Sequence, residues 1–479
     1  MTTELSNFAA RLREHICSFF DVGDDVRSLI FQNRQSAIGN RQLSEPPHVG
    51  SYEKDFNRLA LELFALQFKH NAACRKICEA RHLTPGIVKH WTQIPAVPTA
   101  AFKELELTSL APAERTVVFH SSGTTEQKPS RHHHNAASLA VYETSLWSWF
   151  HANVTIGAPN SASAQTTPDE KHVDSDQPSL RSFGAAGIGA PATRQFQLVI
   201  LTPPPTQAPH SSLVHMFETV RQKLGGASVP ASRSAFFGKV AADGSWTLDF
   251  DAVLAAMSNS TLNLQPSTVI LGTAFSFVHL LDFLGENNLS FQLPPGSQVM
   301  ETGGYKNRSR SMPKTDLHHL ITERLGIPPS HIICEYGMSE LSSQAYDLGA
   351  LASRRRVSSL SSEQDAGVTP ALPGLATRHF RFPPWARVQI ISPETCREVA
   401  DGETGLIRIF DLANIFSVMA VQTEDLGIRR GENFELIGRA ALAEPRGCSL
   451  MMLEGSASSL PQLKTPIKMG IDEAMPSNK

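Results

Sequence analysis

The chain has 479 residues, of which 41% are apolar, and 43 basic and 46 acidic residues give a formal net charge of −3. This length suffices for two to four domains, and the near-neutral charge argues against recognition of nucleic acid or an anionic membrane through an overall field. Six cysteines without a preceding secretory signal favour a reduced, cytoplasmic setting, and no apolar run approaches the roughly 20 residues of a membrane span.

The first 110 residues are predicted to be mainly helical. Apolar residues recur at helical spacing between Phe56 and Phe68, and the segment Ile94 to Pro98 ends this pattern. Cys74 and Cys78 are four residues apart on a helical pattern. Because no second Cys/His pair stands at finger spacing, the sequence does not predict a zinc site there.

A hydroxyl-rich segment follows, His120 to Ser130, which we call the hydroxyl loop. It lies between a predicted strand at Thr116 to Phe119 and a predicted helix at Ala136 to Phe150. Glycine, hydroxyl groups and one lysine in such a loop are suited to wrapping phosphates, although the Walker spacing is absent. An ordinary turn remains the alternative for this segment alone.

Three consecutive histidines, His132 to His134, follow the hydroxyl loop. Consecutive side chains on a helix point in different directions and cannot share one metal ion. We therefore expect a solvated helix start rather than a metal cluster.

From Phe196 onward, apolar strand patterns alternate with helical ones, which predicts an α/β architecture with largely buried strands. The predicted strands are Phe196 to Leu201, Thr268 to Leu271, Val299 to Thr302 and Ile332 to Glu335, and the predicted helices are Ser212 to Leu224, Ala274 to Leu284 and Lys314 to Leu325. Two low-complexity stretches, 155–190 and 353–371, are expected to be disordered insertions.

The pattern changes after Arg381 to short strands joined by turns. These strands are predicted at Arg387 to Ile391, Gly405 to Phe410, Val421 to Thr423 and Phe434 to Ile437. We therefore divide the chain into a helical N-terminal part (1–110), an α/β core (111–380), a β-rich subdomain (381–440) and a short C-terminal element with a tail (441–479).

Polar segments lie at the ends of several predicted strands. They are Gly303-Gly304-Tyr305, Glu335 to Glu340, Thr423 to Gly427 and Gly438-Arg439. Open α/β sheets bind ligands at the carboxyl ends of their strands. The sequence thus predicts that these segments contribute to one site.

This ordered set resembles the adenylate-forming (acyl-activating, AMP-binding) superfamily, and within it the acyl-protein synthetase (LuxE) family. The likeness runs from about Asp55 to Leu450. Besides the segments above, it includes Ile94 to Pro98 with Phe102-Lys103, Leu201 to Pro204, Ser211 to Met216 and Arg446 to Leu450. It implies a large N-terminal domain of the adenylate-forming type, and we expect the standard C-terminal lid domain to be largely missing.

The resemblance also implies roles for individual residues. The ATP phosphates would be bound by Ser121, Ser122, Gly123, Thr124, Thr125 and Lys128, and the adenine would be bordered by Gly303, Gly304, Tyr305, Tyr336 and Gly337. Ser339 would lie near the α-phosphate, and Glu340 would bind Mg²⁺. Asp425 would bind the ribose, and Arg439 would touch the nucleotide at the hinge. The segment Gly272 to Phe275 would border the acyl pocket. The implied cofactors are ATP and Mg²⁺, because a hard divalent cation prefers carboxylate oxygen.

The implied activity is that of a ligase, an acyl-protein synthetase that joins a carboxylic acid, with a fatty acid favoured, to a thiol through an acyl-adenylate. In the resembled family a cysteine near the C-terminus accepts the acyl group, which points to Cys448 as a catalytic residue together with Lys128 and Glu340. Arg446 lies two residues from Cys448, and its positive charge would favour the thiolate form of that cysteine. A reductase is the expected acyl-accepting partner, with no nucleic acid and no membrane span.

Two alternatives remain open from the sequence. One is an acid–coenzyme A ligase similar to phenylacetate ligases, or an adenylating enzyme of a specialised metabolic pathway. The other is a degenerate member that binds nucleotide without catalysis. The identity of the acid is not predicted, because methylene-level selection rests on about 1–3 kcal/mol of packing energy.

Overall fold

The computed structural model describes residues 3–21, 49–121, 128–155, 196–224, 234–258, 267–303, 312–347 and 378–440. A twelve-stranded sheet organises them, in the order β13-β14-β15-β16-β12-β11-β10-β9-β8-β4-β5, with β1 added beside β15. Its strands are β1 (Val97–Pro98), β4 (Phe196–Ile200), β5 (Ser234–Phe236), β8 (Ser267–Thr273), β9 (Gln298–Thr302), β10 (Ile332–Tyr336), β11 (Ala345–Asp347), β12 (Phe380–Arg381), β13 (Ala386–Ile391), β14 (Thr404–Asp411), β15 (Ala420–Arg430) and β16 (Asn433–Arg439).

The sheet has a parallel half and an antiparallel half. Strands β5, β4, β8, β9 and β10 run parallel, whereas β11 to β16 pair antiparallel. Near-continuous apolar runs such as that of β8 fit the parallel half, because helices cover both of its faces. The strands predicted after Arg381 thus continue the same sheet through β11 and β12.

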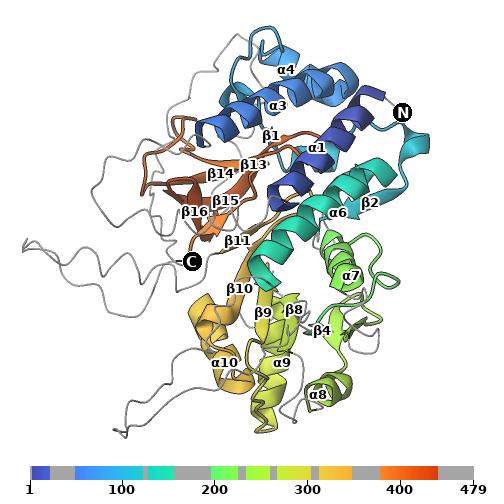
Figure 1. Cartoon of the computed structure of the whole chain (residues 1–479), viewed down its shortest axis with the longest axis vertical. Helices are drawn as coiled ribbons and strands as arrows, with labels where there is room; N and C mark the ends of the chain where they lie inside the picture. Colours follow the sequence, from blue (N-terminus) through green and yellow to red (C-terminus); the bar gives the residue numbers. More distant parts are fainter. Residues whose placement is uncertain are drawn as a thin grey trace, which may run out of the picture.

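Helices form layers around the sheet (Figure 1). They are α1 (Thr3–Asp21), α3 (Val49–His70), α4 (Ala72–Ala80), α5 (Ala101–Glu104), α6 (Ala136–Phe150), α7 (Ser212–Leu224), α8 (Phe250–Ser258), α9 (Ala274–Glu286) and α10 (Lys314–Leu325), with short turns at Trp91–Gln93, Pro112–Glu114, His151–Thr155 and Pro329–His331. On one face Leu271 and Met300 pack in the core that includes α6 and α7. On the other face Ile270 and Val299 pack with α8, α9 and α10.

The segment around the hydroxyl loop differs from the prediction. Strand β2 (Val117–His120) pairs antiparallel with β3 (Arg131–His134), so the loop joins the two strands of a hairpin and does not lead directly into a helix. Helix α6 begins only after β3, with Asn135 as its N-cap.

The expected helix start at the three histidines was therefore wrong. They lie in β3, where alternate side chains face the same side, and His132 and His134 are 4% and 1% exposed. A second hairpin, β6 (Gly238–Val240) with β7 (Trp246–Leu248), was not predicted.

The predicted α/β class is confirmed, and the predicted strands and helices from Phe196 onward are all observed. Their bounds agree within a few residues except for the strand predicted at Val421 to Thr423, which extends to Arg430 in β15. Residues 156–190 and 353–371 of the expected insertions fall outside the described residues. Among the residues that are described, none of the helices is long and apolar enough to cross a membrane.

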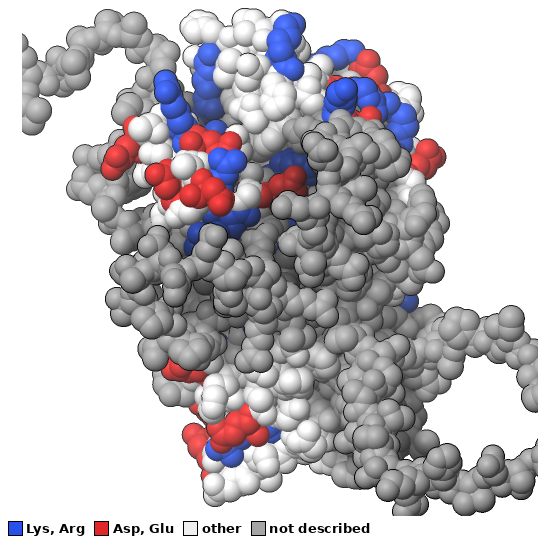
Figure 2. Space-filling model, turned by 60° about the vertical axis from the view of Figure 1, so that its left-hand side comes forward, with Lys and Arg blue, Asp and Glu red and all other residues white. Residues whose placement is uncertain are grey.

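Charged side chains of both signs intermingle on the described part of the face shown in Figure 2. Ion pairs in the β-rich part include Arg430–Glu435 (2.9 Å) and Arg429–Glu398 (3.6 Å). Such pairs contribute little to stability individually.

Candidate active site

Three of the predicted nucleotide-binding residues meet where β10 faces β15 and β16. The Tyr336 hydroxyl, at the end of β10, donates a hydrogen bond to Asp425 Oδ2 at 2.9 Å. Asp425 pairs with Arg439 across β15 and β16, and Arg439 Nε lies 3.6 Å from Asp425 Oδ1. Residues almost ninety positions apart in the sequence thus form one polar corner, which we call the Tyr336–Asp425–Arg439 corner.

The electrostatics of this corner favour hydrogen bonding. Burial and the nearby Asp425 charge raise the pKa of Tyr336 well above its ordinary value, so the phenol stays a donor. Burial also raises the pKa of Asp425, against the opposing effects of Tyr336 and Arg439. The Arg439 side chain is 78% exposed and is free to turn toward a ligand. Each carboxylate oxygen can accept more than one hydrogen bond, so Asp425 retains capacity for ligand hydroxyls.

The Ser339–Glu340 turn follows Tyr336 directly. The Ser339 hydroxyl donates to Glu340 Oε2 at 3.1 Å, and Glu340 is only 6% exposed. Among the described residues, no lysine or arginine forms an ion pair with this carboxylate. A buried carboxylate without a cation is costly, and its hard oxygens suit Mg²⁺, so Glu340 fits the predicted metal role.

A buried hydrogen-bond network fixes the Ser339–Glu340 turn. Asn414 donates to the Glu340 carbonyl at 2.8 Å, and Asp411 accepts from the Ser342 backbone N–H at 2.9 Å and from the Ser343 hydroxyl at 2.7 Å. Burial raises the pKa of Asp411, although these donors oppose the shift. The turn is therefore fixed by the β14 end of the sheet, which sequence reasoning did not identify.

The hydroxyl loop is described only at its two ends. Ser121 Oγ accepts from the Ser130 backbone N–H at 2.9 Å, which closes the loop at its base. Lys128 forms an exposed ion pair with Glu104 at 3.3 Å. Ser122, Gly123, Thr124, Thr125, Gly304, Tyr305 and Cys448 lie outside the described residues.

The end of β9 lies beside the end of β10. Thr302 is the register partner of Glu335 and donates a hydrogen bond to its carboxylate. Burial raises the pKa of Glu335 to about 7, although the Thr302 bond opposes the shift. Gly303 follows with φ +75°, a left-handed conformation that glycine adopts without strain. Gly303 thereby turns the chain away from the sheet next to the Tyr336–Asp425–Arg439 corner.

One histidine that the sequence reading set aside connects two parts of the site. His132 Nδ1 donates to the carbonyl of Ser339 at 2.8 Å, so β3 contacts the Ser339–Glu340 turn directly. Burial lowers the pKa of His132 to about 4, which keeps the imidazole neutral. The signal that was missed is the two-residue periodicity of a strand, which buries His132 and His134 together.

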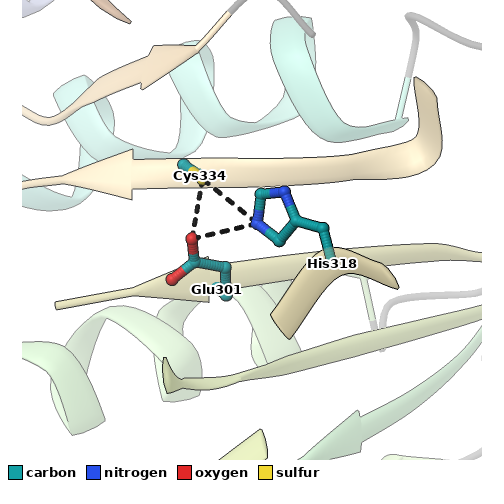
Figure 3. A group of neighbouring side chains, drawn as sticks. All are labelled: Glu301, His318 and Cys334. Atoms are coloured by element: carbon teal, nitrogen blue, oxygen red, sulfur yellow. Dashed lines mark hydrogen bonds and ion pairs between the residues drawn. The ribbon is translucent and has the colours of Figure 1, made fainter. Parts of the chain in front are cut away.

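A second polar cluster lies on the opposite face of β9 and β10 (Figure 3). Glu301, His318 and Cys334 bring one carboxylate oxygen, one imidazole nitrogen and the sulfur within 4.8 Å of one another. Cys334 Sγ lies 2.7 Å from Glu301 Oε1, and His318 Nε2 lies 3.4 Å from the same oxygen. The residue types match a zinc site.

The neighbours of this cluster exclude that reading. Lys314 Nζ lies 3.1 Å from Glu301 Oε1, and the charge of Asp347 is balanced by Arg378. Arg378 Nη1 donates to His318 Nδ1 at 3.2 Å, so the ring hydrogen is on Nε2 and no lone pair of the ring faces the centre of the cluster.

Burial alone would raise the pKa of Glu301, but Lys314 and His318 lower it to about 2. The Glu301 carboxylate is therefore an ion with its own cation beside it. We conclude that the cluster is a buried network of hydrogen bonds and ion pairs centred on one oxygen of Glu301.

Part of the chain resembles a known protein family. Residues 131–360 match the family model described as "Acyl-protein synthetase, LuxE". The predicted resemblance to this family is confirmed. The LuxE-like region includes β3, Tyr336 and Glu340, whereas Asp425 and Arg439 lie beyond it.

Two curated relatives are long-chain-fatty-acid–luciferin-component ligases. The protein from Aliivibrio fischeri is 23% identical over 202 residues, which cover 40% of this chain and 46% of the relative. The one from Vibrio harveyi is 22% identical over 214 residues, which cover 43% of this chain and 49% of the relative. The chain therefore spans about half the length of the curated relatives it matches.

Solved structures extend the likeness in fold. A 2-hydroxyisobutyryl-CoA ligase in the postadenylation state superposes with a TM-score of 0.53 at 12% sequence identity, over 85% of this chain and 74% of that one. An open conformation of a 2-hydroxyisobutyryl-CoA ligase superposes with a TM-score of 0.51 at 11% sequence identity, over 85% of this chain and 82% of that one. The chain thus has the fold of these adenylate-forming ligases.

Proposed function

We propose that this protein is an ATP- and Mg²⁺-dependent ligase that activates a carboxylic acid as an acyl-adenylate and then transfers the acyl group to a thiol. The convergence of the Tyr336–Asp425–Arg439 corner with the Ser339–Glu340 turn at the carboxyl ends of the strands carries this proposal. The LuxE match and the fatty-acid ligases among the relatives support a fatty acid as the substrate.

The nucleotide would span the two halves of the site. Asp425 would accept hydrogen bonds from the ribose hydroxyls, with Tyr336 orienting its carboxylate and Arg439 adding a mobile positive charge. Residues Ser121 to Lys128 of the hydroxyl loop would donate hydrogen bonds to the β- and γ-phosphates. Mg²⁺ bound at Glu340 would neutralise phosphate charge, which is the main obstacle to attack by an anion.

In the first step an oxygen of the acid attacks the α-phosphorus. A new P–O bond forms, the bond to the bridging oxygen breaks, and pyrophosphate leaves with the electron pair. The loop donors and Lys128, released from Glu104, would hold the departing charge. The acyl carbon of the resulting mixed anhydride is then open to a nucleophile.

In the second step we propose that the thiolate of Cys448 attacks this carbon. A C–S bond forms, the C–O bond to phosphate breaks, and AMP leaves. The thioester would pass its acyl group to a partner such as a reductase. A cytoplasmic setting suits this thiol chemistry, and none of the five described cysteines forms a disulfide.

The test is acid-dependent exchange of radioactive pyrophosphate into ATP, over a panel of short, long-chain and aromatic acids. We expect exchange with long-chain acids, a requirement for Mg²⁺ and no requirement for coenzyme A. Intact-protein mass spectrometry should detect one acyl adduct that is lost in Cys448→Ala. No exchange with any acid would refute the proposal, and formation of free acyl-coenzyme A without an adduct would favour the coenzyme A ligase.

A further inference from the structure

His132 lies between the two parts of the site that must act on the same phosphates. Strand β3 begins at Arg131, directly after Ser130, whose N–H closes the base of the hydroxyl loop through Ser121. One position further, His132 Nδ1 reaches the Ser339 carbonyl at 2.8 Å, across 207 residues of sequence. The hydroxyl loop and the Ser339–Glu340 turn are thus joined through one imidazole.

The direction of this bond is fixed by chemistry. A carbonyl oxygen can only accept, so the hydrogen of the neutral imidazole is on Nδ1. His132 is 4% exposed, and water therefore cannot replace the bond without a rearrangement.

Packing also fixes the orientation of the ring. The His134 ring lies 4.2 Å from the His132 ring between centroids, and Phe102 approaches it edge-on at 6.3 Å. His134 lies 3.2 Å from the Ser138 hydroxyl, at the start of α6. The His132 ring is therefore held between α5 and β3 and its Nδ1–H is aimed at one acceptor.

The acceptor belongs to the residue that contacts the candidate metal ligand. The Ser339 hydroxyl binds the Glu340 carboxylate, and Asn414 holds the Glu340 carbonyl from the opposite side. The two backbone carbonyls of the turn thus have one buried donor each, one from the hairpin and one from the turn after β14.

We propose that His132 is a positioning residue that holds the Ser339–Glu340 turn in register with the hydroxyl loop, so that the metal-binding carboxylate and the phosphate-binding loop engage one triphosphate. This inference rests on the proposed function. It predicts that loss of the Nδ1–H bond weakens the use of Mg²⁺ and ATP but not the binding of the acid.

Two substitutions of similar polarity separate this role from simple packing. In His132→Asn the amide nitrogen takes the place of Nδ1 and keeps the donor, whereas in His132→Gln the amide lies near the position of Nε2 and the bond is lost. We expect His132→Gln to lower the kcat of pyrophosphate exchange about tenfold and to raise the half-saturating Mg²⁺ concentration by a similar factor. His132→Asn should stay within about threefold of wild type, and the KM for the acid should change in neither.

The outcomes are distinguishable. Equal losses in both variants would overturn the positioning role, and so would a His132→Gln variant with wild-type Mg²⁺ dependence. In either case, pyrophosphate exchange by the wild-type protein would still uphold the proposed function. Wild-type protein inactive with every acid would overturn both. If His132→Gln does not fold, ¹⁵N-histidine NMR of the wild-type protein decides, because the Nδ1–H signal of His132 should shift when Mg²⁺ and ATP are added together, and an unchanged signal would refute the inference.

Discussion

Two buried glutamates on neighbouring parts of one sheet differ in how completely their charges are matched. Glu301, on β9, is fully buried and has Lys314, His318 and Cys334 around one carboxylate oxygen. Glu340, after β10, is almost as buried, yet the Ser339 hydroxyl is the partner of its carboxylate among the described residues. A carboxylate that serves the fold is neutralised within the protein, whereas one that serves a ligand keeps its capacity for that ligand.

The strongest test of this contrast is Glu340→Gln. The neutral amide should lower the kcat of acid-dependent pyrophosphate exchange about 10²–10³-fold, because the charge that binds Mg²⁺ is lost. The thermal unfolding midpoint should change little, since none of the lysines and arginines that the structure describes forms an ion pair with Glu340. Retained exchange together with a large loss of stability would reverse the assignment.

A third carboxyl, Glu335, tests the effect of burial on a carboxylate that has a hydroxyl as its hydrogen-bond partner. Its folded-state pKa of about 7 lies above the ordinary value of 4.5, so the folded protein binds the proton more tightly than the unfolded chain. This contribution to stability is complete below about pH 4.5 and is lost as the pH rises through 7. The stability of Glu335→Gln relative to wild type should therefore increase by about 3 kcal/mol between pH 4.5 and 7. Urea unfolding of both proteins across this range measures the difference, and a pH-independent difference would contradict the burial argument.

The converse of the first test is Glu301→Gln. Lys314 loses its partner, and His318 and Cys334 lose a charged acceptor, so the free energy of unfolding should fall by about 2 kcal/mol. Pyrophosphate exchange, measured well below the unfolding midpoint, should remain within about threefold of wild type. A metal-binding role for the cluster would instead appear as stoichiometric zinc in the purified wild-type protein and its loss in the variant.

The smallest expected effect belongs to Tyr336→Phe. This change removes one hydrogen bond to Asp425 and leaves the ring packed against Phe434, whose centroid lies 5.4 Å away. A single bond of this kind contributes about 1 kcal/mol, so the KM for ATP should rise about fivefold while the KM for the acid stays unchanged. An equal rise in both constants would show that Tyr336 supports the fold and not the nucleotide.

Sequence reasoning predicted β4, β8, β9 and β10 of the parallel half because each of these strands carries an apolar pattern of its own, whereas the short strand β5 was not predicted. The apolar run of β8 and the periodicity of α10 fix these elements locally. The hairpin at β3 was missed because Arg131 to His134 contains no apolar residue, and its strand character comes from pairing with β2. Strands β11 and β12 have only three and two residues, so their identity likewise depends on their neighbours.

The same distinction applies to the site. Tyr336, Ser339, Glu340 and Asp425 were predicted because each lies in a short motif at a strand end. The partnership of His132 with Ser339, and that of Glu301 with Lys314, depend on how distant elements pack. Local sequence patterns therefore suggested the candidate ligand-binding residues, whereas the residues that hold them in place emerged only from the three-dimensional arrangement.

The central claim is that one nucleotide contacts both the Tyr336–Asp425–Arg439 corner and the Ser339–Glu340 turn. A crystal structure with Mg²⁺ and a non-hydrolysable ATP analogue tests it directly. We predict ribose hydroxyls at Asp425, the metal at Glu340 and the terminal phosphates within the hydroxyl loop. A nucleotide bound elsewhere, or one that leaves Glu340 and Asp425 untouched, would contradict the account.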